Sequence, residues 1–235
     1  MIDTKRIDTS VVLLIVANLI PLIGVLFLGW DIFQILIFFW AESFVIGFYN
    51  ILKMIKAPAP EPNKLGGIIE KIFLIPFFIV HYGGFMFGHL LFIIVFFLSK
   101  VQSSIILTNS SIQQPTTDLI ASGITTALNP LFSQLGWALG ALFISHGISY
   151  YQNYLQKGEY KKTSTAELFV APYGRIIFMH LIIIGGAFVI ILTDASKYLI
   201  IPFIIGKIIF DISAHQRQHS GIQGRANIKD PKKTQ

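Results

Sequence analysis

The chain has 235 residues, of which 54% are hydrophobic and 13% are charged, and it contains 21 Phe but no Cys. A soluble domain usually carries about 25% charged residues, so this chain has too few to cover a water-exposed surface. The lack of Cys excludes disulfides, thiolate metal sites and cysteine nucleophiles, and it leaves nitrogen and oxygen as metal ligands. The composition predicts an all-α fold, a polytopic transmembrane helix bundle that forms a single domain.

Six apolar runs approach or exceed the roughly 20 residues that a helix needs to cross the hydrocarbon layer. They lie at about 11–30, 32–53, 68–99, 131–153, 175–194 and 198–217. The first lacks a small-residue cleavage site and is predicted to be a retained helix. The third is longer than a crossing requires, so it either tilts or begins along the interface. A polar outer loop is predicted at 100–130 and a cytoplasmic tail at 218–235.

Lys and Arg, which give the chain a net charge of +6, alternate between the two sides of these runs. They cluster before the first run, between the second and third, between the fourth and fifth, and after the sixth, whereas 101–130 has none. The positive-inside rule then places both termini in the cytoplasm. We expect a multi-pass protein of the cell membrane (inner or plasma) whose partners are membrane lipids, and no nucleic acid.

Ionisable side chains are rare inside membranes, yet this chain places them in five of the six predicted helices. The candidates are Glu42, His81, His146, His180, Asp211 and His215. At a rise of about 1.5 Å per residue, all of them fall between mid-depth and the cytoplasmic surface. This convergence is typical of a polar site inside a helix bundle. His89 lies nearer the outer surface, away from the others, and is predicted to be a packing residue.

The last apolar run carries an ionisable residue every four positions, in the order Lys207, Asp211, His215 and His219. Residues four apart share one helix face, and two histidines at that spacing are a known metal-binding arrangement. Asp211 would either bind the metal or orient His215 through its second ring nitrogen. The competing interpretation is an ion pair between Lys207 and Asp211, with His219 at the membrane surface.

Taken together, these residues predict an intramembrane metal site, with zinc as the first candidate and iron or manganese left open. The predicted ligands are a subset of His81, His146, His180, Asp211 and His215. Such a metal would activate water against a lipid or acyl bond, with Glu42 as general base, which makes the protein a candidate zinc-dependent membrane hydrolase. Taken singly, His81, His146 and His180 are each better explained as a buried imidazole with its own hydrogen bond.

Two other functions fit the same residues. Two histidines from different helices would serve as the axial ligands of a b-type haem in a redox protein. Alternatively, Glu42, Lys207, Asp211 and the histidines would relay protons in a proton-coupled transporter. No internal repeat is evident, although many transporters have one.

Three stretches of the chain, "FFWAESFVIGFYNILKM", "APYGRIIFMHLIIIGGAF" and "GKIIFDISAHQRQH", resemble a family of prokaryotic multi-pass membrane proteins known as a domain of unknown function. That resemblance covers nearly the whole chain and implies no activity. His215-x-x-x-His219 is also similar to the last-helix motif of the seven-helix zinc membrane hydrolases, the alkaline ceramidases and adiponectin-type receptors. The second resemblance implies zinc at the cytoplasmic side. This chain differs in its six predicted spans and in carrying Asp211 on the same helix as the histidines.

Overall fold

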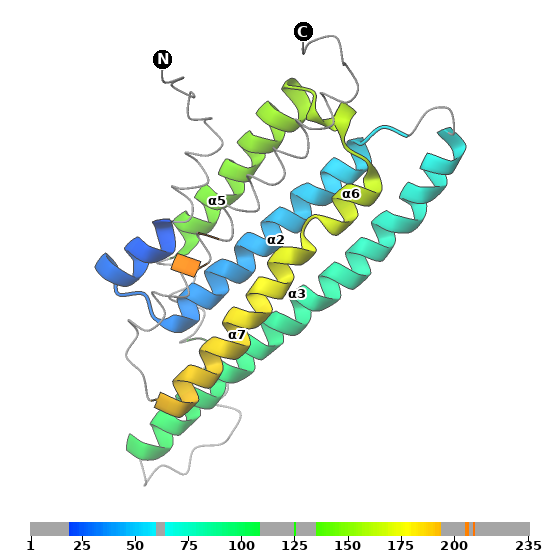
Figure 1. Cartoon of the computed structure of the whole chain (residues 1–235). Coiled ribbons are helices and arrows are strands. Elements are labelled where there is room, and N and C mark those ends of the chain that lie inside the picture. The colour runs from blue at the N-terminus through cyan, green and yellow to red at the C-terminus, as the bar shows by residue number, and fades with distance from the viewer. Residues whose placement is uncertain are drawn as a thin grey trace.

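The computed structural model describes residues 19–59, 64–108, 125, 135–193, 205–206 and 209, with backbone only at 64, 99–108 and 186–193. The regular elements in these residues are helices, which confirms the predicted all-α class. The elements are α2 (Ile32–Lys56), α3 (Lys64–Thr108), α5 (Gly136–Ser149), the π-helix η2 (Tyr150–Gln156), the 3-10 turn η3 (Glu159–Lys162), α6 (Thr165–Val170) and α7 (Tyr173–Thr193). Residues 19–27 are also helical. Figure 1 shows the long helices packed side by side along one axis.

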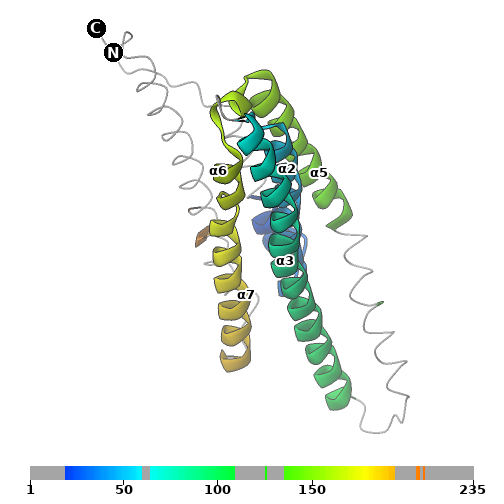
Figure 2. The ribbon, with the colours of Figure 1, turned by 90° about the vertical axis from the view of Figure 1, so that its right-hand side faces the viewer.

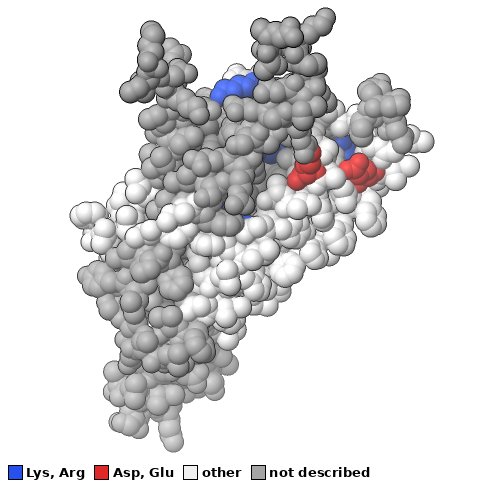
Figure 3. Space-filling model, in the orientation of Figure 1, with Lys and Arg blue, Asp and Glu red and all other residues white. Residues whose placement is uncertain are grey.

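Three segments of the described residues are long and apolar enough to cross a membrane. They are Ile32–Lys56, Leu65–Leu98 and Thr165–Gly185, and the last of these includes α6 and the first part of α7. On the face shown in Figure 3, the described charged side chains lie toward one end of the molecule, and the rest of the described surface is largely uncharged. This distribution is the one expected for a membrane protein. Most of the sixth predicted span lies outside the described residues.

Helix α2 is the centre of the bundle. In an apolar stretch of 18 residues of α2, 61% of the residues are buried inside the bundle. The corresponding shares for Leu65–Leu98 and Thr165–Gly185 are 28% and 33%. Helices α3, α5, α6 and α7 all pack against it. Figures 1 and 2, which differ by a quarter turn, show α5 on one side of α2, and α3 and α7 on the other.

Contacts between the helices establish their relative directions. Tyr49 and Lys53 of α2 contact Phe143 and Tyr154 of the continuous α5–η2 helix in the same order, so the two helices run parallel. Helices α3 and α7 also run parallel to each other, as the two histidine contacts described below show. Helix α2 runs opposite to α3 and α7. These four directions are those that the predicted alternation of spans requires.

A compact turn sets the start of α2. Gly29 has φ +68°, a conformation that glycine adopts without strain. The turn places the fully buried Trp30 ring against Gly24, where an added Cβ would lie 2.3 Å from the ring. Asp31 and Gln34 then form a capping box, in which each side chain accepts a hydrogen bond from the backbone N–H of the other. The chain therefore enters α2 in a defined direction.

Helix α3 is longer than its apolar sequence predicts. It has 45 residues and continues past 99, the predicted end of the span, to Thr108. At 1.5 Å per residue it is about 68 Å long, roughly twice the thickness of the hydrocarbon layer. The first residues of the predicted outer loop are thus an extension of α3, and most of the remainder of 100–130 lies outside the described residues.

Hydrogen bonds from side chains to backbone carbonyls connect α2 to its neighbours. Trp40 Nε1 donates to the carbonyl of Met86 on α3 at 2.7 Å. Asn50 Nδ2 donates to the carbonyl of Leu168 on α6 at 2.8 Å. Such bonds strengthen helix packing within a bilayer, where helix association gains little from the hydrophobic effect.

Candidate functional site

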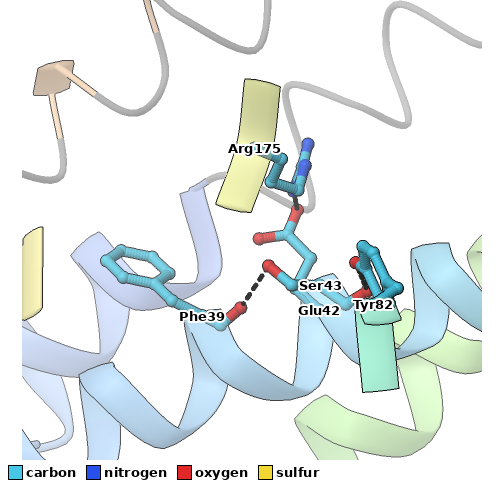
Figure 4. Close-up of polar contacts among 5 residues, drawn as sticks. All are labelled: Phe39, Glu42, Ser43, Tyr82 and Arg175. Atoms are coloured by element: carbon cyan, nitrogen blue, oxygen red, sulfur yellow. Dashed lines mark hydrogen bonds and ion pairs between the residues drawn. The ribbon is translucent and has the colours of Figure 1, made fainter. Parts of the chain in front are cut away.

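The most deeply buried charged group of the described residues is Glu42, in the middle of α2. Its side chain is 2% exposed, and its Oε1 lies 3.0 Å from Nη1 of Arg175, the third residue of α7. Arg175 is 17% exposed. Figure 4 shows the carboxylate directed at the guanidinium group. The predicted functional carboxylate is therefore one half of an interhelical ion pair, the usual arrangement for a charge inside a membrane bundle.

The residue after Glu42 joins the same helix to α3. Tyr82 of α3 donates its hydroxyl proton to the backbone carbonyl of Ser43 at 2.7 Å, and the Ser43 hydroxyl donates to the carbonyl of Phe39 at 3.0 Å. Figure 4 shows both bonds beside the ion pair. Two successive residues of α2 thus contact α7 and α3, so the three helices are held together at one level of the bundle.

A pair of histidines connects α3 and α7. His89 Nε2 and His180 Nδ1 lie 2.6 Å apart, with the ring planes at 83°. His89 is buried at 6% exposure, and His180 is partly buried. The sequence predicts that His89 lies nearer the outer surface, away from His180 and the other histidines. The structure places its ring nitrogen against that of His180.

His81 also contacts α7, but at a more exposed position. Its Nδ1 lies 2.7 Å from the hydroxyl of Tyr173, at the start of α7, and its ring stacks on Phe77 of its own helix at 5.2 Å. His81 and His89 are eight residues apart on α3, and their partners Tyr173 and His180 are seven apart on α7. This nearly equal spacing, about two turns, is what two parallel helices require for successive contacts.

His146 lies on the opposite side of α2. Its ring is stacked near Tyr49, with the centroids 6.5 Å apart and the planes at 24°. Gly147, the next residue, permits this close approach, because an added Cβ would lie 2.7 Å from the Tyr49 hydroxyl. His146 therefore belongs to the α2–α5 interface rather than to the contacts made by α7.

The described residues thus bring together part of the predicted site. Glu42, His81 and His180 all lie at contacts made by α7, at successive positions along it, whereas His146 is separate. Within the described part of the chain, no group of three or more His, Asp or Glu side chains is placed to hold a metal ion. Asp211 and His215, as well as Lys207 and His219, lie outside the described residues.

Three residues of the site were absent from the predicted set: Arg175, Tyr173 and His89. Arg175 lies at the first turn of an apolar run, where Lys and Arg indicate the orientation of the chain. The two-turn spacings of His81 and His89, and of Tyr173 and His180, are the sequence signal for the histidine contacts.

The comparisons with known proteins place the chain in a family but give no activity. No curated protein and no solved structure matches it. Residues 2–227 match the model of DUF6498, described as a family of unknown function. The match covers nearly the whole chain, including the helices that carry Glu42, His89 and Arg175. The chain therefore belongs to the DUF6498 family.

Proposed function

We propose that this protein is a six-span protein of the cell membrane that binds a transition metal, zinc first, between α3 and α7. The observation that supports this is the contact between His89 and His180, whose ring nitrogens lie 2.6 Å apart inside the bundle. In tetrahedral zinc sites with Zn–N bonds of about 2.0–2.1 Å, two ligand nitrogens are roughly 3.4 Å apart. The two imidazoles therefore need to separate by less than about 1 Å to share an ion.

A stable zinc site needs more than two protein ligands, and the predicted sixth span supplies candidates. Asp211 and His215 are four residues apart in the sequence, the spacing that places two ligands on one helix face. The proposed set is therefore His89, His180, Asp211 and His215. His81 and His146, which the sequence also nominates, would have to leave Tyr173 and Tyr49 to join it.

For a site of this kind we favour hydrolysis of a lipid or acyl bond, as in the seven-helix zinc hydrolases that the last-helix motif resembles. Zinc would supply the activation of a water molecule. Glu42 would accept the proton of that water, and Arg175, which holds Oε1, would orient the carboxylate. His180 is five residues beyond Arg175 on α7, about 7.5 Å along the helix axis, so a substrate that used both groups would have to extend along α7.

Metal analysis of the purified protein tests the first step. The full chain, loaded with zinc in detergent and then desalted, is expected to retain stoichiometric zinc. His89→Ala and His180→Ala are each expected to lose it, because each removes one of the four proposed ligands of a tetrahedral site. His146→Ala is the matched control and keeps its zinc. No retained zinc in the unmodified protein, or full zinc in both site variants, overturns the proposal.

A proton-coupled transporter is the second candidate, and the Glu42–Arg175 ion pair inside an apolar bundle favours it. Buried acids and histidines form proton relays in membrane carriers. Proteoliposomes loaded with a pH-sensitive dye and driven by a potassium diffusion potential would report proton entry. Glu42→Gln is expected to abolish that entry, whereas Glu70→Gln, at the start of α3, leaves it unchanged. Equal proton entry in empty liposomes and in proteoliposomes removes this candidate.

A b-type haem is the third use proposed for a histidine pair from two helices. His89 and His180 bond directly to each other here, so a haem at these ligands would require α3 and α7 to separate further than zinc does. The absorption spectrum of freshly purified protein decides the matter. A Soret band that His180→Ala removes would support haem, and a spectrum without that band excludes it.

A further inference from the structure

At the end of the bundle where α2 finishes, two tyrosine rings pack against each other and against α2. Tyr154, at the end of η2, is 2% exposed, and its hydroxyl donates to the carbonyl of Lys53 at 2.9 Å. Gly158, with φ +72°, turns the chain back so that Tyr160 of η3 meets Tyr154, with the ring centroids 6.2 Å apart. We call these two rings the tyrosine platform. Their packing against α2 makes the platform part of the folded core.

Three lysine ammonium groups surround the platform. Lys56 Nζ and Lys161 Nζ lie 5.6 Å and 5.8 Å from the centroid of the same ring, that of Tyr160. Lys53 Nζ lies 5.5 Å from the centroid of Tyr154. These lysines come from α2 and η3, so the fold brings them together. Both Lys56 and Lys161 place an ammonium group near the same ring, so an anion at the edge of that ring would be attracted by both.

An apolar side chain adjoins these charges. Ile55, which precedes Lys56, is 57% exposed, in a helix long and apolar enough to span a membrane. Tyr and Lys are the residues that favour the membrane–water interface, and the Lys-rich end of the bundle is the one predicted to be cytoplasmic. A ligand that fits this surface has a negative head and a hydrocarbon tail.

We propose that Lys56, Lys161 and Tyr160 form a binding site for the phosphate headgroup of an anionic phospholipid. The headgroup phosphate lies between the two ammonium groups at the edge of the tyrosine platform, and an acyl chain runs along α2 past Ile55. Glu159, the acidic residue of η3, lies beside Tyr160 in the sequence and limits the site to a singly charged headgroup rather than a polyphosphate. The site is separate from the contacts of Glu42 and His180.

Native mass spectrometry of the full chain in a neutral detergent tests the proposal. Phosphatidylglycerol is expected to be retained on the protein, whereas phosphatidylcholine, which has no net charge, is not. Inorganic phosphate is the third probe, because it offers the same anion without a tail. Retention of phosphatidylcholine equal to that of phosphatidylglycerol, or an equal affinity for inorganic phosphate, overturns the assignment to an anionic lipid.

Adjacent lysines supply a matched control. Lys161→Gln and Lys56→Gln are each expected to weaken phosphatidylglycerol binding about fivefold, since a lysine near an anionic membrane surface contributes about that factor. Lys162→Gln removes the same charge one residue away and is expected to change binding by less than about twofold. Equal losses in Lys161→Gln and Lys162→Gln would show a diffuse charge effect and overturn the site. Unchanged binding in Lys56→Gln would also overturn it.

Discussion

His89 of α3 and His180 of α7 are 91 residues apart in the chain, yet their ring nitrogens are 2.6 Å apart. Arg175, on the same helix as His180, pairs with Glu42 of α2. Both contacts lie among helices long and apolar enough to span a membrane. Chemistry that uses Glu42, His89 or His180 therefore depends on the position of α7.

Loss of one partner of the Glu42–Arg175 pair should destabilise the fold strongly. Arg175→Leu leaves a buried carboxylate without its cation, and breaking a buried ion pair in this way costs about 3–5 kcal/mol. The double variant Glu42→Leu with Arg175→Leu removes both charges and is expected to recover most of that loss. Thermal unfolding in detergent measures both, and a double variant less stable than Arg175→Leu alone would contradict the assignment of a paired charge.

Substitution of Gly47 should separate α2 from α3. A Cβ at this position would lie 2.4 Å from the Tyr82 ring, which is buried and held by its bond to Ser43, so it has little freedom to move. We expect Gly47→Ala to lower stability by about 1–3 kcal/mol. Gly84→Ala on α3 is the control, because a Cβ there meets nothing within 4 Å. Equal unfolding temperatures for the two variants would refute the close contact.

The Tyr82 hydroxyl should contribute a smaller, separable amount. Tyr82→Phe keeps the ring against Gly47 but leaves the Ser43 carbonyl without this donor, so we expect a loss of about 0.5–1.5 kcal/mol. Tyr151, whose ring is 57% exposed, provides Tyr151→Phe as the comparison, and no measurable loss is expected there. A Tyr82→Phe variant as stable as the unmodified protein would show that the hydrogen bond does not stabilise the helix packing.

The predicted topology can be measured directly, because the chain has no Cys of its own. Single substitutions therefore introduce a unique label site. Thr117→Cys, in the predicted outer loop, should react with a membrane-impermeant maleimide in intact cells. Lys162→Cys, at the opposite end, should react only after the membrane is opened. Labelling of Lys162→Cys in intact cells would reverse the orientation, and labelling of both would refute the six-span arrangement.

The sequence predicts well where the long apolar helices lie in the chain. It predicts the ends of those helices less well. The run 32–53 corresponds to Ile32–Lys56, and 175–194 to Tyr173–Thr193, because burial in hydrocarbon selects both the apolar composition and the helical backbone. The run 68–99 underestimates α3 because hydropathy marks where a helix meets hydrocarbon. A helix continues for as long as its backbone bonds are favourable, and α3 reaches Thr108 past the mostly polar stretch 100–104.

The candidate site was only partly predictable. Glu42 stands out in the sequence because a carboxylate in an apolar run needs an explanation. Its partner Arg175 does not, because the rotation of α7 about its axis, and hence which face meets α2, depends on packing between segments far apart in the chain. The same holds for His89, because the apolar run 68–99 ends before the helix does and so does not give the depth of a residue along α3.

Helix α7 has consequences for how the protein can respond to a signal. Within a short stretch, α7 contacts α2 through Arg175 and α3 through His180, on different faces of the helix. A rotation of α7 about its axis by a fraction of a turn would break both the Glu42–Arg175 and the His89–His180 contacts. Because both contacts belong to one helix, a change at either one would be expected to alter the geometry of the other.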